Sequence, residues 1–388
     1  MEAKINRKTL FNIWTSYATY YFGKVNLSIV IPVLLVAHKN LSLYNVGLVS
    51  SGFFFAYAIG QFLHGQISEK YNPFIYIAVG LILSGILNCF LGFFAGFFII
   101  LLIGEILDGF VQSMGWSSCV KANALTQSNK VREKSTIILG TSYQIGNSLA
   151  WLISAFAVGQ WGWRAGFFVA SIFLIIRGIL LLLIKPKIKL KKRSKIKTQI
   201  KKTLSLPILI SGLSLCLLNM VRYGVITWIP LYLFQSNNMV VQDMGKVGLK
   251  VFLIPVAGVL GTLLYNKIKL NKNILTIFYL CLLSLSIFLF PFVNSVFMVV
   301  VLLLSGFFLY GPHVFLVTTL PSRCLDKQTV AASTGFIDGM GYVGAVLIGL
   351  IVPFLINLNN GWNGVFIFWS ILPIIISLLM LLSYRMEK

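Results

Sequence analysis

Residues 16–26 of the chain read SYATYYFGKVN, and they lie inside an apolar segment that extends from residue 11 to residue 36. Lys24 therefore lies about halfway along a stretch that is otherwise compatible with lipid. A charged side chain at the centre of a membrane helix costs about 2.5–3.5 kcal/mol on insertion scales, and such residues usually serve a function. Residues 219–224, NMVRYG, repeat this arrangement about half a chain later with Arg222. The pattern predicts a membrane protein of two related halves, each contributing a cation to the functional site.

The composition of the whole chain supports a membrane protein. Of its 388 residues, 58% are hydrophobic and only 11% are charged, and the mean hydropathy is +0.89. A soluble protein carries about 25% charged residues. The apolar runs are continuous rather than alternating, which favours helices over strands. We therefore predict an all-α membrane protein with twelve transmembrane helices, at residues 11–36, 44–67, 74–94, 97–120, 136–158, 166–184, 206–234, 247–265, 274–293, 297–320, 332–356 and 365–384.

The positive charges of the chain are concentrated in alternate connections between these helices. Residues 4–8, 121–134 and 185–202 are rich in Lys and Arg, whereas the intervening connections hold only Lys39, Arg164 and Lys246. The positive-inside rule then places both termini in the cytoplasm of a cell that carries the protein in its inner or plasma membrane. The formal net charge of +23 is thus explained by topology and by contact with anionic membrane lipid, and no nucleic-acid partner is expected.

The two halves of the chain resemble each other at a fixed offset. Lys24 aligns with Arg222, Ile145-Gly146 with Val343-Gly344, and Gly162-Trp163 with Gly361-Trp362, each about 198 residues later. We expect an N-terminal six-helix half at 1–184, a basic cytoplasmic linker at 185–205 and a C-terminal six-helix half at 206–388. Two parallel halves of six helices are the organisation of the major facilitator fold.

Short motifs along nearly the whole chain carry a more specific resemblance. In chain order they are Tyr20-Tyr21, Ala56-Tyr57, Asn72-Pro73, Met114-Gly115-Trp116, Arg222-Tyr223-Gly224, Ala257-Gly258, Tyr310-Gly311-Pro312, Gly341-Tyr342 and Gly361-Trp362. Each motif is weak alone, but their order and spacing resemble the organophosphate:phosphate antiporter family of the major facilitator superfamily, and in particular its glycerol-3-phosphate and sugar-phosphate transporters.

The resemblance implies a substrate site and a transport mechanism. In this family a basic residue from the first helix and one from the seventh bind the phosphate group, and these positions correspond to Lys24 and Arg222. Guanidinium and ammonium groups suit a phosphate dianion, because they supply charge and several hydrogen-bond donors. Five tyrosines fall on cavity positions of the family: Tyr17, Tyr21, Tyr57, Tyr310 and Tyr342. The implied mechanism is rocker-switch alternating access.

Several positions depart from the family pattern, and they leave the substrate open. Lys24 replaces the usual arginine, and Gln61 stands where the glycerol-3-phosphate type has a lysine. Tyr143 replaces a histidine of that type, while Pro255 and Thr227 replace acidic residues. A lysine can lose its proton in a dry site, whereas an arginine practically cannot. The anion-binding cations are thus retained, but the carbon skeleton of the substrate does not follow.

Other ionisable residues are candidates for proton coupling or for gating. Glu105 and Asp108 lie three residues apart on one helix face, and buried carboxyls in transporters can carry protons or pair structurally with cations. Asp338 and His313 are two further coupling candidates. The loop after the second predicted helix carries Gly65, Glu69 and Lys70, at the position of a conformational latch in the superfamily; the alternative is ordinary loop charge.

The sequence thus predicts a secondary transporter and not an enzyme. Its expected cargo is an organophosphate, such as glycerol phosphate or a sugar phosphate, exchanged for inorganic phosphate by a monomer that needs no cofactor. No glycine-rich phosphate loop precedes a Lys-Ser/Thr pair, and the five cysteines show no metal-ligand spacing. One alternative is a proton-coupled symporter or exporter of a carboxylate or other organic anion. Another is a transporter-like sensor of sugar phosphate.

Overall fold

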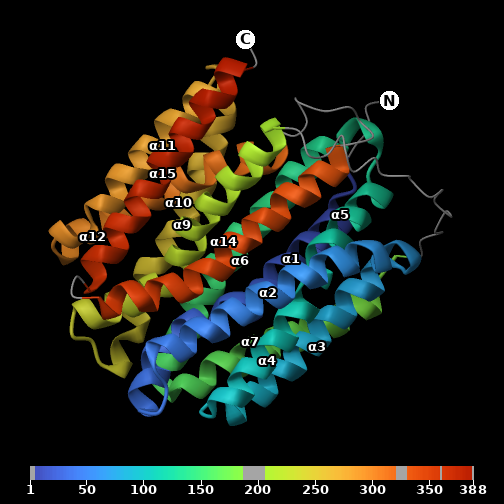
Figure 1. Cartoon of the computed structure of the whole chain (residues 1–388). Helices are drawn as coiled ribbons and strands as arrows, with labels where there is room; N and C mark the ends of the chain where they lie inside the picture. The colour runs from blue at the N-terminus through green and yellow to red at the C-terminus, as the bar shows by residue number, and fades with distance from the viewer. Residues whose placement is uncertain (1–4, 187–205, 320–329, 359–360, 387–388) are drawn as a thin grey trace. The chain divides into compact units, whose positions relative to one another are not determined.

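The computed structural model describes residues 5–186, 206–319, 330–358 and 361–386, and these residues form helices joined by short connections (Figure 1). No strand occurs within these ranges, and the predicted all-α fold class is confirmed. The helices up to residue 184 are α1 (Arg7–Ala37), α2 (Leu43–Ile67), α3 (Pro73–Phe94), α4 (Phe98–Gln112), α5 (Met114–Thr126), α6 (Asn129–Trp161) and α7 (Trp163–Ile184), with a short 3₁₀ turn η1 (Ser68–Lys70).

The second part of the described chain continues the pattern. Its helices are α9 (Leu206–Ser236), α10 (Met244–Lys267), α11 (Lys272–Phe288), α12 (Ser295–Val314), α14 (Val330–Asn357) and α15 (Gly361–Met386). Two 3₁₀ turns, η2 (Val241–Asp243) and η3 (Phe290–Phe292), lie between helices, and α12 continues into a π-helical segment η4 (Phe315–Thr319).

Eleven described helical segments are long and apolar enough to cross a membrane. The predicted helix at 97–120 is interrupted at Ser113, where α4 ends and α5 begins. The predicted helix at 136–158 corresponds to α6, which is 33 residues long but is not among the eleven. The polar side chains of α6 make it less apolar than the eleven other segments. Three of them, Gln144, Asn147 and Ser148, are buried within the protein.

The chain divides into two compact units. The first unit comprises residues 1–193 with 233–252, and the second comprises residues 194–232 with 253–388. The unit boundary falls within α9 and α10, because a short piece of each helix belongs to the first unit. The linker predicted at 185–205 lies almost wholly outside the described residues. The division into six-helix halves at 1–184 and 206–388 therefore stays a prediction.

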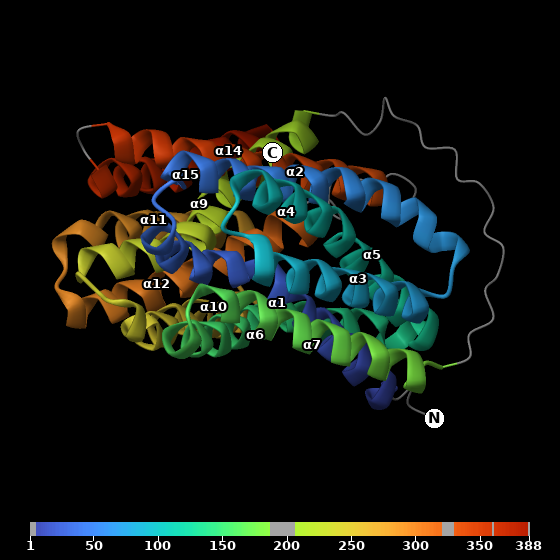
Figure 2. The same cartoon turned by 90° about the horizontal axis from the view of Figure 1, so that it is seen from below.

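Within the first unit, α3 packs along α7, α1 packs along α6 and α7, and α2 packs along α4 (Figures 1 and 2). Small residues allow these close approaches. A Cβ added to Gly109 of α4 would overlap the carbonyl oxygen of Phe53 of α2, and one added to Gly146 of α6 would overlap that of Ala18 of α1. Without a hydrophobic drive between helices in lipid, such backbone contact is a main source of packing energy.

The second unit uses the same device. There α11 packs against α12 and α15, and α14 packs against α15. A Cβ on Gly261 of α10 would overlap the carbonyl oxygen of Phe307 of α12, and one on Gly344 of α14 would overlap that of Cys216 of α9. Glycine at these positions is therefore required by contact between helix backbones.

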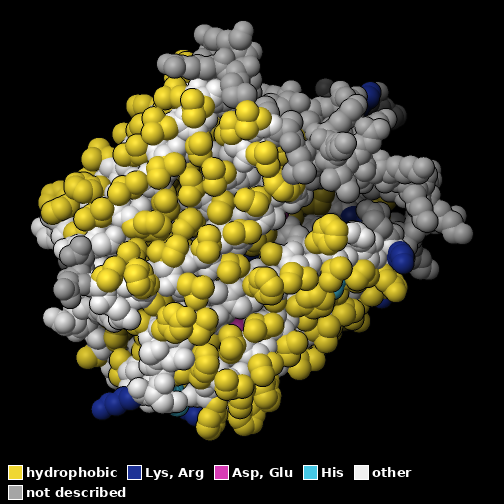
Figure 3. All heavy atoms as spheres, viewed as in Figure 1, with side chains coloured by type: hydrophobic (Ala, Val, Ile, Leu, Met, Phe, Trp, Pro, Cys, Tyr) yellow, Lys and Arg dark blue, Asp and Glu magenta, His cyan; other side chains and the backbone are white. Residues whose placement is uncertain are grey.

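The outer surface of the helices is apolar, as a lipid-facing surface should be. Hydrophobic side chains cover most of the face shown in Figure 3, and few charged side chains lie among them. Large apolar side chains that face outward include Phe278 of α11, Phe354 of α14 and Leu378 of α15. Polar groups that would be costly in lipid lie inside instead, which is consistent with a multi-pass membrane protein.

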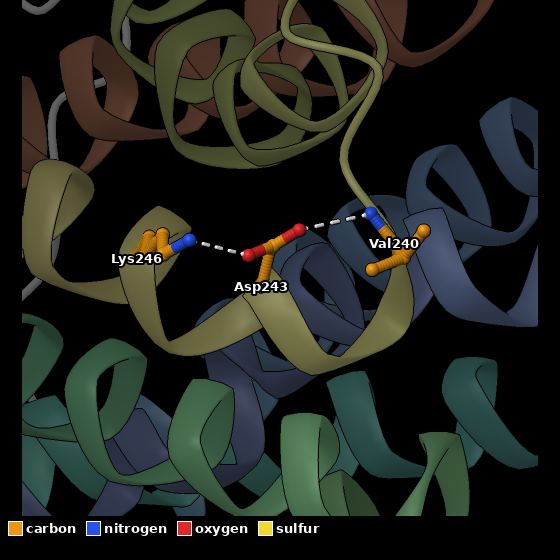
Figure 4. Close-up of polar contacts among 3 residues, drawn as sticks. All are labelled: Val240, Asp243 and Lys246. Carbon is orange, nitrogen blue, oxygen red and sulfur yellow. Dashed lines mark hydrogen bonds and ion pairs between the residues drawn. The ribbon is translucent and has the colours of Figure 1, made fainter.

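The connection into α10 is held by a local polar contact (Figure 4). The Asp243 carboxylate accepts a hydrogen bond from the Val240 backbone N–H at 3.2 Å, and Lys246 donates to its other oxygen at 2.7 Å. Lys246 is mostly exposed, with 71% of its side chain accessible. Asp243 thus satisfies the backbone N–H of the residue that precedes the turn, as the acidic residue of a capping box does.

Candidate functional site

Lys24 of α1 lies in an aromatic environment within the first unit. Its Nζ atom lies 3.8 Å from the ring centroid of Tyr57 of α2 and 5.5 Å from that of Tyr21. Tyr57 and Tyr21 are buried, whereas Lys24 is half-buried. An ammonium over an aromatic face is attracted by the ring quadrupole, and the attraction is strongest away from water. The lysine therefore lies between a ring of its own helix and a ring of α2.

The aromatic cluster around Lys24 extends through four helices. Tyr17 and Tyr21 have ring centroids 5.8 Å apart, and Tyr21 lies 6.2 Å from Tyr143 of α6. Tyr17 also lies 4.8 Å from Trp116 of α5. Helical spacing explains part of this grouping, because Tyr17, Tyr21 and Lys24 are four and three residues apart and share one face of α1. The predicted substrate-binding residues of the first unit thus form one connected cluster, with the exception of Gln61.

Gln61 occupies the next turn of α2 after Tyr57. The two residues are four apart and share a helix face, and Gln61 is half-buried. An amide in this place offers both donors and an acceptor but no charge. Phenol and amide groups thus lie on the turns next to the Lys24 ammonium group.

Arg222 of α9 lies in a comparable group within the second unit. It is 5% exposed, and its NH1 atom lies 3.0 Å from Nε2 of His313 of α12. Its Cζ atom lies 5.0 Å from the ring centroid of Tyr223 and 5.7 Å from that of Tyr310. The second unit thus surrounds its cation with rings, as the first unit does.

Two residues of α14 join the Arg222 group through Tyr223. The rings of Tyr223 and Tyr342 have centroids 6.1 Å apart, and Asp338 lies close enough to Tyr223 for an electrostatic interaction. Asp338 and Tyr342 are four residues apart on one face of α14. All the sequence-predicted candidates of the second unit, Arg222, Tyr310, His313, Asp338 and Tyr342, are therefore brought together.

The two carboxyl groups of α4 are buried, and that of Asp108 belongs to a separate hydrogen-bond network. Asn26 of α1 donates to Oδ1 of Asn88 of α3 at 2.7 Å, and Asn88 donates to Oδ2 of Asp108 and to the Ser84 carbonyl, each at 3.0 Å. Oδ1 of Asp108 has no hydrogen-bond partner in the described residues. Glu105 and Asp108 are 2% and 1% exposed, and neither forms an ion pair within the described ranges. They are placed as a buried acidic pair on one helix face.

The predicted latch is only partly described. Gly65 has open space where a Cβ would lie, Lys70 is exposed, and the side chain of Glu69 lies outside the described residues. The loop is held instead by Lys121 of α5, which donates to the backbone carbonyls of Ser68 and Tyr71. Lys121 was counted in the sequence only as a topology charge, and nothing in its spacing indicated this contact.

Sequence reasoning also missed Tyr223 and Trp116 as site residues. Both residues belong to motifs noted in the sequence, Arg222-Tyr223-Gly224 and Met114-Gly115-Trp116. Tyr223 directly follows a predicted site residue and Trp116 directly follows a motif glycine, and these positions could have indicated them. No metal site accompanies these clusters, since no group of three His, Cys, Asp or Glu residues within the described ranges could hold a metal ion.

Comparisons with known proteins bear on the family and the fold of the chain. A family model described as Major Facilitator Superfamily matches residues 13–348. The membrane sensor protein UhpC of Escherichia coli (strain K12) is 27% identical to the chain, over 97% of the chain and 91% of UhpC. The glycerol-3-phosphate transporter of Bacillus subtilis (strain 168) is 25% identical, over 94% of the chain and 89% of that protein.

A solved structure shows the same fold. The bacterial homolog of the human lysosomal transporter Spinster, in its inward-facing and occupied conformation, matches with a TM-score of 0.78. The match covers 99% of this chain and 98% of that one, at 14% sequence identity. At that identity the likeness concerns the fold alone.

Proposed function

Since the chain belongs to the Major Facilitator Superfamily, we propose that it is a secondary transporter that exchanges a small organophosphate for inorganic phosphate. The resemblance to the organophosphate:phosphate antiporter family is confirmed by its relatives, one of which is named a glycerol-3-phosphate transporter. One observation carries the proposal. Each compact unit holds a cation, Lys24 or Arg222, beside the rings of buried tyrosines.

The chemistry of the two cations fits a phosphate group. A phosphate dianion that leaves water needs compensating charge and several donors for its oxygens. Arg222 offers a planar fork of donors, and Lys24 offers a compact charge with three rotatable donors. The buried hydroxyls of Tyr21 and Tyr310 can supply further donors. We propose that both cations take part in binding the transported anion.

The departures from the family pattern bear on the organic part of the substrate. Gln61 replaces a charged lysine of the glycerol-3-phosphate type, and Tyr143 replaces a histidine. Gln61 lies one turn of α2 beyond Tyr57, whose ring is close to Lys24. Tyr143 lies against Tyr21, whose ring is also close to Lys24. We propose that they contact the part of the substrate that is not phosphate, where hydroxyl groups suit an amide and a phenol as partners.

Topology and assembly are part of the same proposal. The alternation of basic connections favours cytoplasmic N- and C-termini, and anionic lipid is the expected partner of the basic segments. We propose that the transporter works as a monomer by alternating access.

A second candidate function is sensing rather than transport. The relative that is 27% identical is named a membrane sensor protein, and it matches the chain over nearly its whole length. A sensor would bind an organophosphate with the same cations but would not exchange it. A third candidate is proton-coupled symport or export of another organic anion, with Glu105, Asp108 or Asp338 carrying the proton.

One experiment separates these candidates. Purified protein is placed in liposomes loaded with inorganic phosphate, and uptake of labelled glycerol 3-phosphate and glucose 6-phosphate is measured. Exchange predicts uptake that requires internal phosphate and persists with a proton uncoupler. Uptake that requires an inward proton gradient, without internal phosphate, would indicate symport. Saturable binding without uptake under either condition would indicate a sensor, and both of these results would refute exchange.

A further inference from the structure

His313 contacts Arg222 directly, and this contact fixes the chemical state of the imidazole. The NH1 atom of Arg222 lies 3.0 Å from Nε2 of His313. A guanidinium carries five N–H donors and no acceptor, so Nε2 must supply the lone pair. In this arrangement His313 is therefore neutral, with its proton on Nδ1.

A phosphate group changes what this pair requires. Arg222 brings one positive charge to the anion, and its donors can serve two oxygens in a bidentate pair. When those donors turn to the anion, the bond to His313 is lost and Nε2 is free to take up a proton from water. The protonated ring then has an N–H at Nε2, beside Arg222, that can donate to another oxygen of the same phosphate.

The titratable groups that lie against this pair in the described part of the second unit carry no positive charge. Tyr223 of α9 and Tyr310 of α12 lie against Arg222, and Tyr342 and Asp338 of α14 lie against Tyr223. The phenols are neutral donors, and Asp338 is an acid. Tyr265 of α10 and Tyr279 of α11 line α12 at Gly311, which is two residues earlier and thus on a different helix face.

We propose that His313 is a proton-carrying ligand of the transported anion, neutral and hydrogen-bonded to Arg222 before binding and protonated when a phosphate group is bound. This inference rests on the proposed function of the same site. Each anion bound in this way takes up one proton from solution onto Nε2, and no other covalent bond is made or broken. Because linkage is reciprocal, protons then strengthen anion binding as much as the anion strengthens proton binding.

The backbone at His313 supports a residue that changes partner. Pro312 precedes it inside α12 and has no backbone N–H to donate, and α12 passes into the π-helical segment η4 at Phe315. Segments of π-helix are rare and often occur at functional sites. His313 thus lies where the regular hydrogen bonding of α12 is already interrupted.

The test compares inorganic phosphate binding to the wild-type protein and to His313→Gln between pH 6 and pH 8. Glutamine retains an acceptor for Arg222 but does not titrate. Phosphate itself titrates identically in both experiments, so the ratio of the two affinities isolates the histidine. We expect this ratio to rise in favour of the wild type as the pH falls, by up to about tenfold per pH unit. A ratio that stays constant over this range would overturn the inference while leaving organophosphate exchange intact.

Two further measurements guard the result. If His313→Gln does not fold, His313→Asn provides the same comparison. Proton uptake on addition of phosphate in a weakly buffered solution should be larger for the wild type than for either variant, and equal uptake would contradict the proposal. If the wild type binds neither inorganic phosphate nor an organophosphate at any pH, the proposed function itself fails and this inference fails with it.

Discussion

Replacing Asn88 with leucine should destabilise the first unit more than any comparable surface change. Asn88 is fully buried on α3 and joins three helices, because it accepts from Asn26 of α1 and donates to Asp108 of α4. Leucine has a similar volume but cannot form either bond. The substitution leaves the Asn26 amide group and Oδ2 of Asp108 buried without these partners.

The expected loss follows from those two groups. A buried polar group left without a partner costs about 1–3 kcal/mol, which gives about 2–6 kcal/mol for two. Hydrogen bonds between membrane helices average only about 0.6 kcal/mol, so the expected value lies at the low end, about 2 kcal/mol. Asp108→Asn keeps a carbonyl acceptor for Asn88, so this substitution should lower the free energy of unfolding clearly less than Asn88→Leu does.

Thermal unfolding of the detergent-solubilised protein measures these effects. Asn129→Leu, at an exposed position of α6, is the matched control because it makes the same change without removing a buried bond. We expect Asn88→Leu to lower the apparent Tm by several degrees and Asn129→Leu to leave it near the wild type. If Asn88→Leu melts with the wild type, or if the control falls equally, the network does not stabilise the unit.

Three further predictions concern packing and the site. Gly109→Ala should cost about 1–3 kcal/mol in thermal unfolding, because its Cβ would meet the Phe53 backbone, whereas Gly140→Ala, with open space around the Cβ, should not destabilise. Tyr57→Leu should weaken phosphate binding by about two- to thirtyfold, because it removes the ring beneath Lys24. Tyr57→Phe keeps the ring and should retain most of the affinity. Equal affinities of the two variants for phosphate would refute the role of the ring. Tyr20→Phe should cost about 0.5–1.5 kcal/mol of stability because the Tyr20 hydroxyl donates to the Ile77 carbonyl at 2.8 Å, and Tyr44→Phe, at an exposed position, should cost nothing measurable.

The helices of this protein follow almost directly from its sequence. Continuous apolar runs bounded by Asn, Pro and Gly are strong local signals, and α2 and α3 differ from their predicted ranges by one residue at their starts. The break at Ser113 was not predicted, because no proline or charged residue interrupts residues 109–120 and a single serine is tolerated in a helix. Its chain neighbours Gly115 and Trp116 pack against Tyr20 and Tyr17, so tertiary contacts explain the local structure there.

The candidate site was predictable only where its residues share one helix. The shared face of Tyr17, Tyr21 and Lys24 follows from helical spacing alone. The contact of Lys24 with Tyr57 joins two helices, and the sequence offered it only through family resemblance. The bond between Arg222 and His313 joins residues 91 positions apart, and no periodicity within one helix could reveal it. Asn88 lies in an apolar run, where its polar partners on α1 and α4 are invisible until the helices pack.

The central claim is that both cations bind the phosphate group of the substrate. Equilibrium binding of labelled inorganic phosphate to purified wild-type protein, Lys24→Ala and Arg222→Ala tests it most directly, with thermal unfolding to confirm that each variant is folded. The account predicts that either substitution abolishes binding while the protein remains folded. Phosphate binding of wild-type strength in either folded variant would contradict it.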